Sequence, residues 1–218
     1  MTGPRTPGPL GREPTGSDSA DQLRLGTTLV GRDDIDAEAL AGGAKITEVT
    51  HDWSDPPTPT VAETPEVSGK TLQDVAAALG TDEWGSGGGG FQYDYRTDNG
   101  KDYVVKFTGT FQITLPKWLE YGSATVKQKA AWDAMITNLR AHEDEHVAIH
   151  YRALQKLVKK LDGLPFQKLA SEAAATRAET KAAHKAFDTS TDHGAKAFGN
   201  FKKVELDLSA DPPPKPAP

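Results

Sequence analysis

The chain has 218 residues, a net charge of −6 and no cysteine. This length suits one domain with its own core plus tails, and the lack of cysteine excludes disulfides and thiolate metal ligands. An acidic balance without a basic cluster argues against a nucleic-acid partner, and no apolar run approaches the roughly 20 residues that cross a membrane.

The N-terminal segment, residues 1–40, is expected to be disordered, because its first part is rich in Gly, Pro, Ser and Thr. It has no apolar h-region, so it does not resemble a Sec-type signal peptide. We therefore expect a cytoplasmic protein by default, with export by a non-classical route as the alternative. The folded domain is expected over residues 44–208, and a proline-rich disordered tail over residues 209–218.

The first half of the predicted domain carries short strand patterns and one helix. Residues 45–53 form a loose strand pattern, and residues 66–69 indicate a short strand and turn. A helix is predicted over 72–79, with Thr71 as its N-cap and Gly80 at its C-terminus. The glycine-rich run 85–90 is interpreted as a mobile connection that could act as a flap. A phosphate-binding loop would need a helix after it, and a strand pattern follows instead.

The second half contains the strongest patterns. Asn99-Gly100 is a hairpin turn signal between strand patterns at 91–96 and 101–107. Further strands are predicted at 110–115, closed by Pro116, and at 202–208. Two helices, from about residue 124 to 161 and from 166 to about 187, complete the layout. The expected fold class is α+β, with a small, mostly antiparallel sheet packed on a long helix and a second, antiparallel helix.

An H-E-x-x-H motif, His142-Glu143-Asp144-Glu145-His146, lies inside the long predicted helix. Residues four apart share a helical face, so His142 and His146 can bind one metal ion. Both continue the apolar stripe of the helix, where unpaired polar groups are costly, and a metal ion would satisfy both. A hydrogen-bonded pair of core histidines is the alternative. Glu143 is the predicted general base, because a carboxylate beside the ligands can take a proton from metal-bound water.

The search for a third ligand uses the geometry of a helical hairpin. His150 follows the motif by one turn, but it lies about 12 Å from His142 along the helix axis, too far to share one ion with it. His150 is therefore predicted to be a pocket or core residue. If the second helix folds back antiparallel, residues 182–187 return to the level of the motif, and the polar turn 188–194 lies at the mouth of the site.

Two histidines qualify at that level, His184 on the predicted helix and His193 in the turn. His193 is preferred, because Gly194 follows it and a tight turn can present a side chain freely. His184 fits a surface histidine equally well. Asp188 and Asp192 are interpreted as carboxylates that could accept a hydrogen bond from a liganding imidazole, or simply as turn residues. His184 and Asp188 remain the alternatives to His193 as the third ligand.

Several blocks occur in a fixed order between residues 67 and 194. They are Val67-Ser68-Gly69-Lys70-Thr71, Ile113-Thr114-Leu115-Pro116-Lys117-Trp118, Trp132, the H-E-x-x-H block, and Phe187-Asp188-Thr189-Ser190-Thr191-Asp192-His193-Gly194. In these blocks the chain resembles a bacterial family of predicted zinc-dependent proteases that is known as a domain of unknown function. The resemblance implies a zincin-like peptidase and favours His193 as a ligand. Many members look exported, whereas this chain shows no signal peptide.

The expected function is that of a zinc-dependent metallopeptidase, with Zn²⁺ as cofactor and a peptide or protein as substrate. Glu143 would pass the proton of the attacking water to the leaving amine, and Tyr151 or Tyr121 could supply a second electrophile. Residues 107–115, which include Ile113, could offer an edge strand that pairs with an extended peptide. The alternatives are a non-catalytic module in which zinc pins two helices together, and a delivered effector protein.

Overall fold

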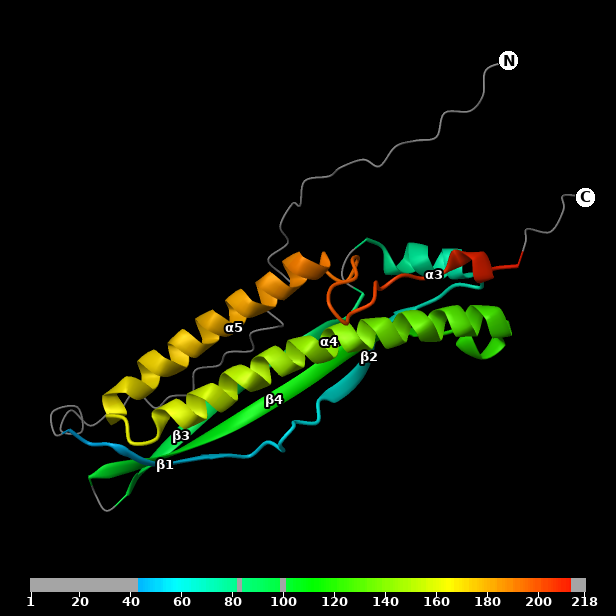
Figure 1. Ribbon diagram of the computed structural model, residues 1–218. Coiled ribbons are helices and arrows are strands. Elements are labelled where there is room, and N and C mark those ends of the chain that lie inside the picture. The colour runs from blue at the N-terminus through cyan, green and yellow to red at the C-terminus, as the bar shows by residue number, and fades with distance from the viewer. Residues whose placement is uncertain (1–42, 82–83, 99–100, 213–218) are drawn as a thin grey trace, which may run out of the picture.

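Figure 1 shows the computed structural model, which describes residues 43–81, 84–98 and 101–212. The predicted disordered segment 1–40, the turn at Asn99-Gly100 and most of the predicted tail lie outside the described residues. The elements are β1 (Ile46–His51), β2 (Thr60–Val67), α3 (Leu72–Leu79), β3 (Ser86–Asp98), β4 (Asp102–Trp118), α4 (Val126–Leu161) and α5 (Leu169–Thr191), with 3-10 turns η1 (Tyr121–Ser123), η2 (Phe166–Lys168) and η3 (Leu208–Ala210).

Strand β4 is the centre of a four-stranded sheet. β3 pairs with it antiparallel along one edge, whereas β1 and β2 pair with it parallel, one after the other, along the opposite edge. Two of the three pairings are parallel, so the expectation of a mostly antiparallel sheet was wrong. The antiparallel expectation came from a turn signal that specifies only the hairpin of β3 and β4. That hairpin is confirmed.

The long strand β4 joins two segments that were predicted as separate strands. Pro116 does not close it, because the register between β2 and β4 shifts between Glu63 and Glu66, opposite the proline. A β-bulge is one of the few places where a strand accepts a residue without a backbone N–H. Ile113 pairs with Val61 on one side and with Gly87 on the other. The prediction of an edge strand at 107–115 was therefore wrong.

Helices α3 and α4 begin at the side-chain caps that the sequence supplies, and α3 ends at a glycine. In α3, the Thr71 side chain accepts a hydrogen bond from the Asp74 N–H and the Asp74 carboxylate accepts one from the Thr71 N–H. Gly80 follows with φ 72°, a conformation that glycine adopts without strain. The same reciprocal cap, made by Thr125 and Gln128, starts α4. The predicted α+β class and the helix at 72–79 are thus confirmed.

Helix α4 crosses the sheet with one buried stripe, and α5 folds back antiparallel beside it (Figure 1). The turn between the two helices is held by β1, because Ile46 donates its N–H to the Leu164 carbonyl and accepts one from Gly163. None of the helices among the described residues is both long and apolar enough to cross a bilayer.

The glycine-rich run is part of the sheet and not a mobile connection. Residues 86–90 form the first half of β3 and pair with residues 110–114 of β4. A Cβ on Gly87 would lie 2.2 Å from the backbone oxygen of Glu143, and one on Gly89 would lie 2.8 Å from Cδ2 of His150. The missing side chains therefore let α4 rest directly on the backbone of β3.

The C-terminal segment is an extended strap and not the strand predicted at 202–208. The Asn138 amide of α4 donates to the Lys203 carbonyl (3.1 Å), and η3 follows. The Asp211 carboxylate accepts hydrogen bonds from Leu72 N (2.7 Å), Gln73 N (3.0 Å) and Gln128 Nε2 (2.8 Å). Ordered chain thus continues past residue 209, where the disordered tail was predicted to begin.

Candidate metal centre

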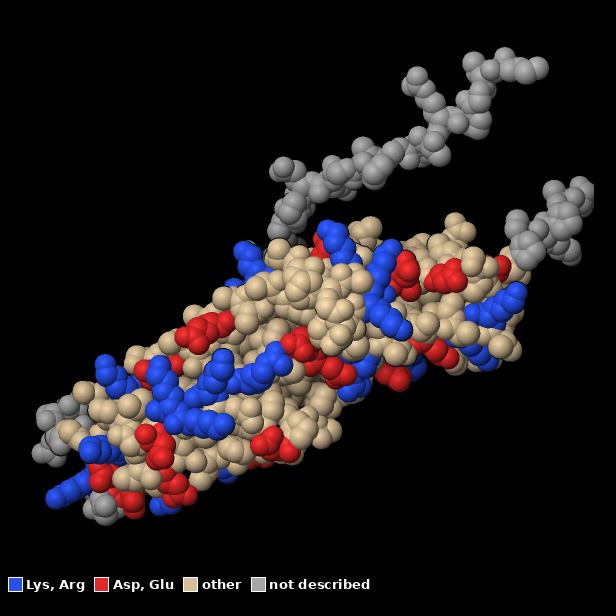
Figure 2. All heavy atoms as spheres, in the orientation of Figure 1, with Lys and Arg blue, Asp and Glu red and all other residues tan. Residues whose placement is uncertain are grey.

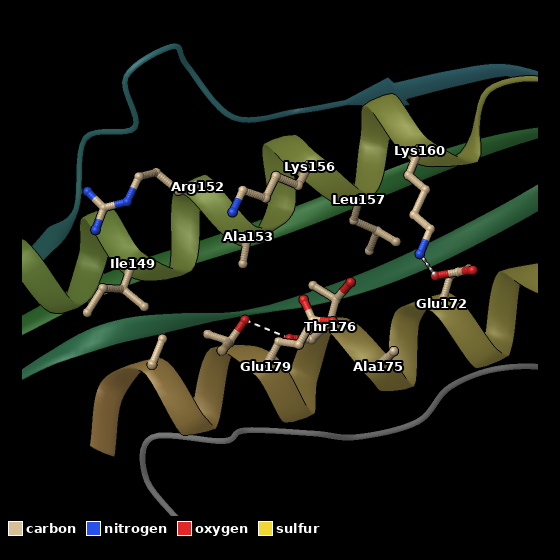
Figure 3. Close-up of a pocket in the computed structure, with 12 residues that line it drawn as sticks. Ile149, Arg152, Ala153, Lys156, Leu157, Lys160, Glu172, Ala175, Thr176 and Glu179 are labelled. Atoms are coloured by element: carbon tan, nitrogen blue, oxygen red, sulfur yellow. Dashed lines mark hydrogen bonds and ion pairs between the residues drawn. The ribbon is translucent and has the colours of Figure 1, made fainter. Parts of the chain in front are cut away.

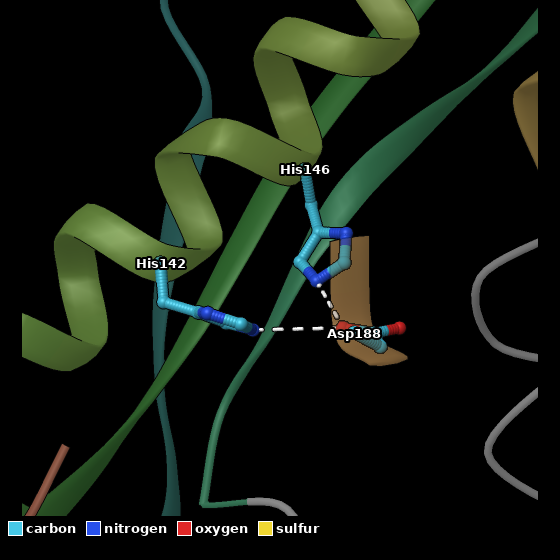
Figure 4. A group of neighbouring side chains, drawn as sticks. All are labelled: His142, His146 and Asp188. Carbon is cyan, nitrogen blue, oxygen red and sulfur yellow. Dashed lines mark ion pairs between the residues drawn. The ribbon is translucent and has the colours of Figure 1, made fainter. Parts of the chain in front are cut away.

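Two histidines of α4 and one aspartate of α5 face one another in the helical hairpin. His142, His146 and Asp188 are all buried, and each has one ligand-type atom within 4.8 Å of the other two. Asp188 Oδ1 lies 2.8 Å from His146 Nε2 and 3.6 Å from His142 Nε2. Figure 4 shows the two rings pointing at the same carboxylate from one side of α4.

The helical hairpin explains why these residues meet. His142 and His146 are one turn apart on α4, and His184 and Asp188 are one turn apart on α5. His184 Nδ1 lies 2.7 Å from His146 Nδ1, so α5 does reach the level of the motif near residues 182–187, as predicted. Equal distances from a helical turn lie side by side in an antiparallel pair.

The environment of each ring orients its Nε2 atom toward Asp188. The hydrogen bond between His146 and His184 uses Nδ1 of His146 and leaves Nε2 toward the carboxylate. Phe187 stacks on His142, with ring centroids 4.8 Å apart, and meets His146 edge-on at 5.1 Å. Partners of this kind fix the rotation and tautomer of liganding histidines in metalloproteins.

The structure does not bring His193 into this group. His193 lies in the turn after α5 with φ 52°, and its side chain is exposed. Asp192, which also has a positive φ, pairs with Lys196 (3.0 Å) and not with an imidazole. Asp188, which the sequence suggested as an orienting carboxylate or as an alternative to His193, is the residue that the structure places within reach of both imidazoles.

Glu143 is buried on the side of α4 that faces β3. One residue past His142, it is rotated by about 100° around the helix, and its backbone rests on Gly87. Glu143 therefore lies between the group of His142, His146 and Asp188 and the glycine-rich half of β3. That position suits a carboxylate that acts on a molecule bound along β3.

A bacterial family described as a protein of unknown function (DUF922) matches residues 62–194, more than half of the chain. The chain belongs to this family. Comparison with curated proteins and with solved structures found no match. The DUF922 region begins in β2 and ends just after α5, so it contains His142, Glu143, His146 and Asp188. A bacterial family of unknown function, as expected from the sequence blocks, is thereby confirmed, whereas the zinc-protease part of that expectation stays a prediction.

His150 of the DUF922 region is a buried core residue, as predicted, and lies outside the group of His142, His146 and Asp188. It is buried between α4 and the rings of Phe91 and Phe111 (centroids 6.3 and 5.7 Å away). Its Nε2 atom has no hydrogen-bond partner among the described residues. Burial lowers the pKa of His150 from 6.5 to about 4, against a smaller opposite effect of the Gly90 backbone.

Acid should therefore destabilise the metal-free protein through His150. Because the folded-state pKa of about 4 lies below 6.5, the unfolded chain takes up the proton first as the pH falls. The free energy of unfolding therefore keeps its full value above about pH 6.5 and decreases as the pH falls toward 4, because only the unfolded chain binds the proton in that range. His150→Leu should reduce the loss of unfolding free energy between pH 7 and pH 5 by about 2 kcal/mol, measured by denaturant titration with a chelator present. The exposed His51→Leu variant is the control, and an unchanged pH dependence in His150→Leu would contradict the prediction.

Two tyrosines that were considered as electrophiles lie elsewhere in the DUF922 region. The Tyr121 hydroxyl donates to both Asp133 carboxylate oxygens (3.0 Å), near the start of α4. The Tyr151 hydroxyl donates to Asp55 and accepts a bond from Gln155. Nine residues past His142, Tyr151 also projects from the opposite side of α4. The structure brings neither hydroxyl to the group of His142, His146 and Asp188.

Proposed function

We propose that this DUF922 protein is a zinc-dependent metallopeptidase with His142, His146 and Asp188 as metal ligands. The observation that carries the proposal is the convergence of two buried imidazole Nε2 atoms on one buried carboxylate oxygen. Two nitrogens and one oxygen form a ligand set that suits zinc, and catalytic zinc sites use three protein ligands of this type. The chain has no cysteine that could compete.

Glu143 is the residue of this chain that would move protons in the reaction. When bound, zinc supplies a Lewis acid that lowers the pKa of water to about 7 and polarises a carbonyl oxygen. The Glu143 carboxylate takes the proton of the attacking water and gives it to the nitrogen of the departing amine. Its place between the ligand group and β3 supports this role, because β3 is where an extended peptide can lie.

The architecture supports a zincin-like assignment as part of this proposal. The H-E-x-x-H motif lies in the middle of a 36-residue helix that packs on the sheet, and the third ligand comes from a later helix. The α+β arrangement alone does not imply an activity, because one fold hosts many functions. The proposed activity therefore rests on the ligand and base residues of the site and not on the fold.

One observation favours a second candidate, a non-catalytic module in which zinc joins α4 to α5. The ligand group connects the two long helices directly, through the contact between His146 and Asp188. A structural zinc ion would stabilise that hairpin by binding only the folded state. Such a module needs the ligands but has no use for the buried Glu143 carboxylate.

The proposal is tested by metal analysis together with peptide cleavage. We expect about one zinc ion per chain in purified protein, and cleavage of casein or of a peptide library that a chelator abolishes and added Zn²⁺ restores. Stoichiometric zinc without any chelator-sensitive cleavage would support the structural module instead. Protein that binds no zinc would refute both candidates.

A further inference from the structure

Strand β3 offers its outer edge to an extended ligand. β4 is paired along both edges, whereas the outer edge of β3 pairs with no other strand among the described residues. Unpaired backbone N–H and C=O groups on such an edge can bind an added strand. Because α4 rests on Gly87 and Gly89, this edge runs close to Glu143 and the ligand group.

A cationic side chain from α5 lies along the same strand. The Arg177 guanidinium carbon is 4.3 Å from the centroid of the Phe91 ring of β3. Arg177 is half-buried, and burial lowers its pKa, opposed by the smaller influence of Tyr93. Among the described residues, no carboxylate forms an ion pair with Arg177. A guanidinium carries a planar fork of N–H donors that matches a carboxylate, and the contact with Phe91 holds this one beside β3.

The cations on the outer side of the two helices differ from Arg177. Lys and Arg side chains gather over the C-terminal half of α4, with acidic side chains among them (Figure 2). There Lys160 pairs with Glu172 (2.5 Å) beside a cavity of about 210 Å³, shown in Figure 3. Arg152 pairs with Glu145 (2.5 Å). These cations already have acidic partners, whereas Arg177 faces the sheet without one.

Arg177 lies about 10 to 13 Å from the site, whether the distance is followed along β3 or along α5. Phe91 lies four residues beyond Gly87 on β3, which is about 13 Å of strand. Arg177 lies seven residues before His184 on α5, which is about 10 Å of helix. Residues an even number of positions apart share one face of a strand. A peptide aligned with β3 would thus bring one residue to Glu143 and the residue four positions away to Arg177.

We infer that Arg177 is a specificity-determining residue that binds a substrate carboxylate about four positions from the scissile bond. This inference rests on the proposed peptidase function and adds a substrate class to it, namely acidic peptides. The carboxylate can belong to an Asp or Glu side chain or to the C-terminus of the peptide. Charge-assisted, bidentate pairing with Arg accepts both sources.

The test compares matched peptides that differ in one charge. Amidated peptides carry Glu, Gln or Lys four positions from the cleaved bond, on either side, and a further peptide ends there with a free carboxylate. The wild-type protein should prefer the Glu peptide over the Gln peptide by about tenfold or more in kcat/KM. Preference for the free terminus over the Glu side chain would identify the C-terminal carboxylate as the ligand.

Charge reversal at Arg177 separates specificity from folding. Arg177→Glu should invert the preference so that the Lys peptide is cleaved faster than the Glu peptide, and Arg177→Gln should bring the Glu/Gln ratio close to one. Lys156→Glu, the same charge change on the outer side of the helices, should leave the ratio unchanged. Because each result is a ratio within one protein, a partial loss of folded protein does not affect it.

A binding measurement keeps this inference distinct from the proposed function. Fluorescently labelled Glu and Gln peptides are titrated into zinc-loaded Glu143→Gln protein, with and without Arg177→Glu, and followed by anisotropy. A charge preference that Arg177→Glu inverts supports the inference even if no peptide is cleaved, in which case only the peptidase activity fails. Equal binding of the two peptides, or a Glu preference that survives Arg177→Glu, would overturn the inference.

Discussion

Replacing Glu143 with Gln should lower kcat for peptide hydrolysis by about 10²- to 10⁴-fold while zinc stays bound. Gln has the size and shape of Glu, so the buried side-chain position is still filled, but an amide cannot accept the proton of the attacking water. The measurements are steady-state cleavage of a fluorogenic peptide and the zinc content of the same sample.

Glu145→Gln is the matched control for this variant. Glu145 belongs to the same motif, yet its side chain pairs with Arg152 and not with the ligand group. Its removal should therefore leave kcat nearly unchanged. Equal kcat in the wild type and in Glu143→Gln would exclude the proposed role of Glu143 as general base.

Replacing Asp188 with Ala should weaken zinc binding by more than about 100-fold. Loss of a residue that only supports a ligand typically costs 10- to 100-fold in metal affinity, so a direct ligand should cost more. Affinity is measured by competition with a chromophoric chelator, and circular dichroism checks that the helices persist. Asp188→Asn keeps the shape of the side chain without its charge and tests the same point with less disturbance of the hairpin.

His193→Ala is the comparison that decides between the two candidate ligands. The His193 side chain is exposed and lies outside the group of three converging residues, so its removal should leave zinc affinity within about twofold, the size of an ordinary surface effect. A large loss in His193→Ala with little change in Asp188→Ala would instead assign His193 as the ligand. That result would mean that the turn after α5 moves when metal binds.

Local patterns were sufficient for α3, for α4 and for the β3–β4 hairpin. Thr71 and Gly80 are signals that act within one helical turn, and they mark the ends of α3. The apolar stripe of α4 is set by its own 3.6-residue period. These features depend on residues close in sequence, and a pattern search can read them directly.

The parallel partners of β4 could not be predicted in the same way. β2 is exposed at every position except Val67, so it has no alternation of apolar and polar residues to reveal its length. Only its end, near residue 66, was predicted as a strand. Its pairing with β4 depends on contacts between segments about 50 residues apart, and no local signal specifies them.

The residues of the candidate site likewise differ in how far the sequence predicts them. His142, Glu143 and His146 follow from a motif within one helix, whereas the third position depends on where α5 ends. The sequence predicted an end near residue 187, because residues 188–194 were interpreted as a polar turn. In the structure the Thr189 hydroxyl donates to the Lys185 carbonyl (2.8 Å) and the Thr191 hydroxyl to the Phe187 carbonyl (3.0 Å). Helix α5 continues through Asp188 to Thr191 with these hydroxyls bonded inside the helix, and the i, i+4 spacing of His184 and Asp188 was the signal that could have revealed it.

The C-terminal strap limits where the chain can be truncated without loss of contacts around the site. Phe201 packs on Phe187 (5.2 Å between ring centroids), Val204 donates its N–H to the Gly194 carbonyl (2.8 Å), and the Asp211 carboxylate accepts from the start of α3. All three lie beyond the stretch that defines the family, as does β1 at the other end. A fragment trimmed to the family boundaries would lack Phe201. Phe187, which stacks on His142, would then lose the ring that packs against it. Residues 44–211 are the shortest piece that keeps both ends of this framework.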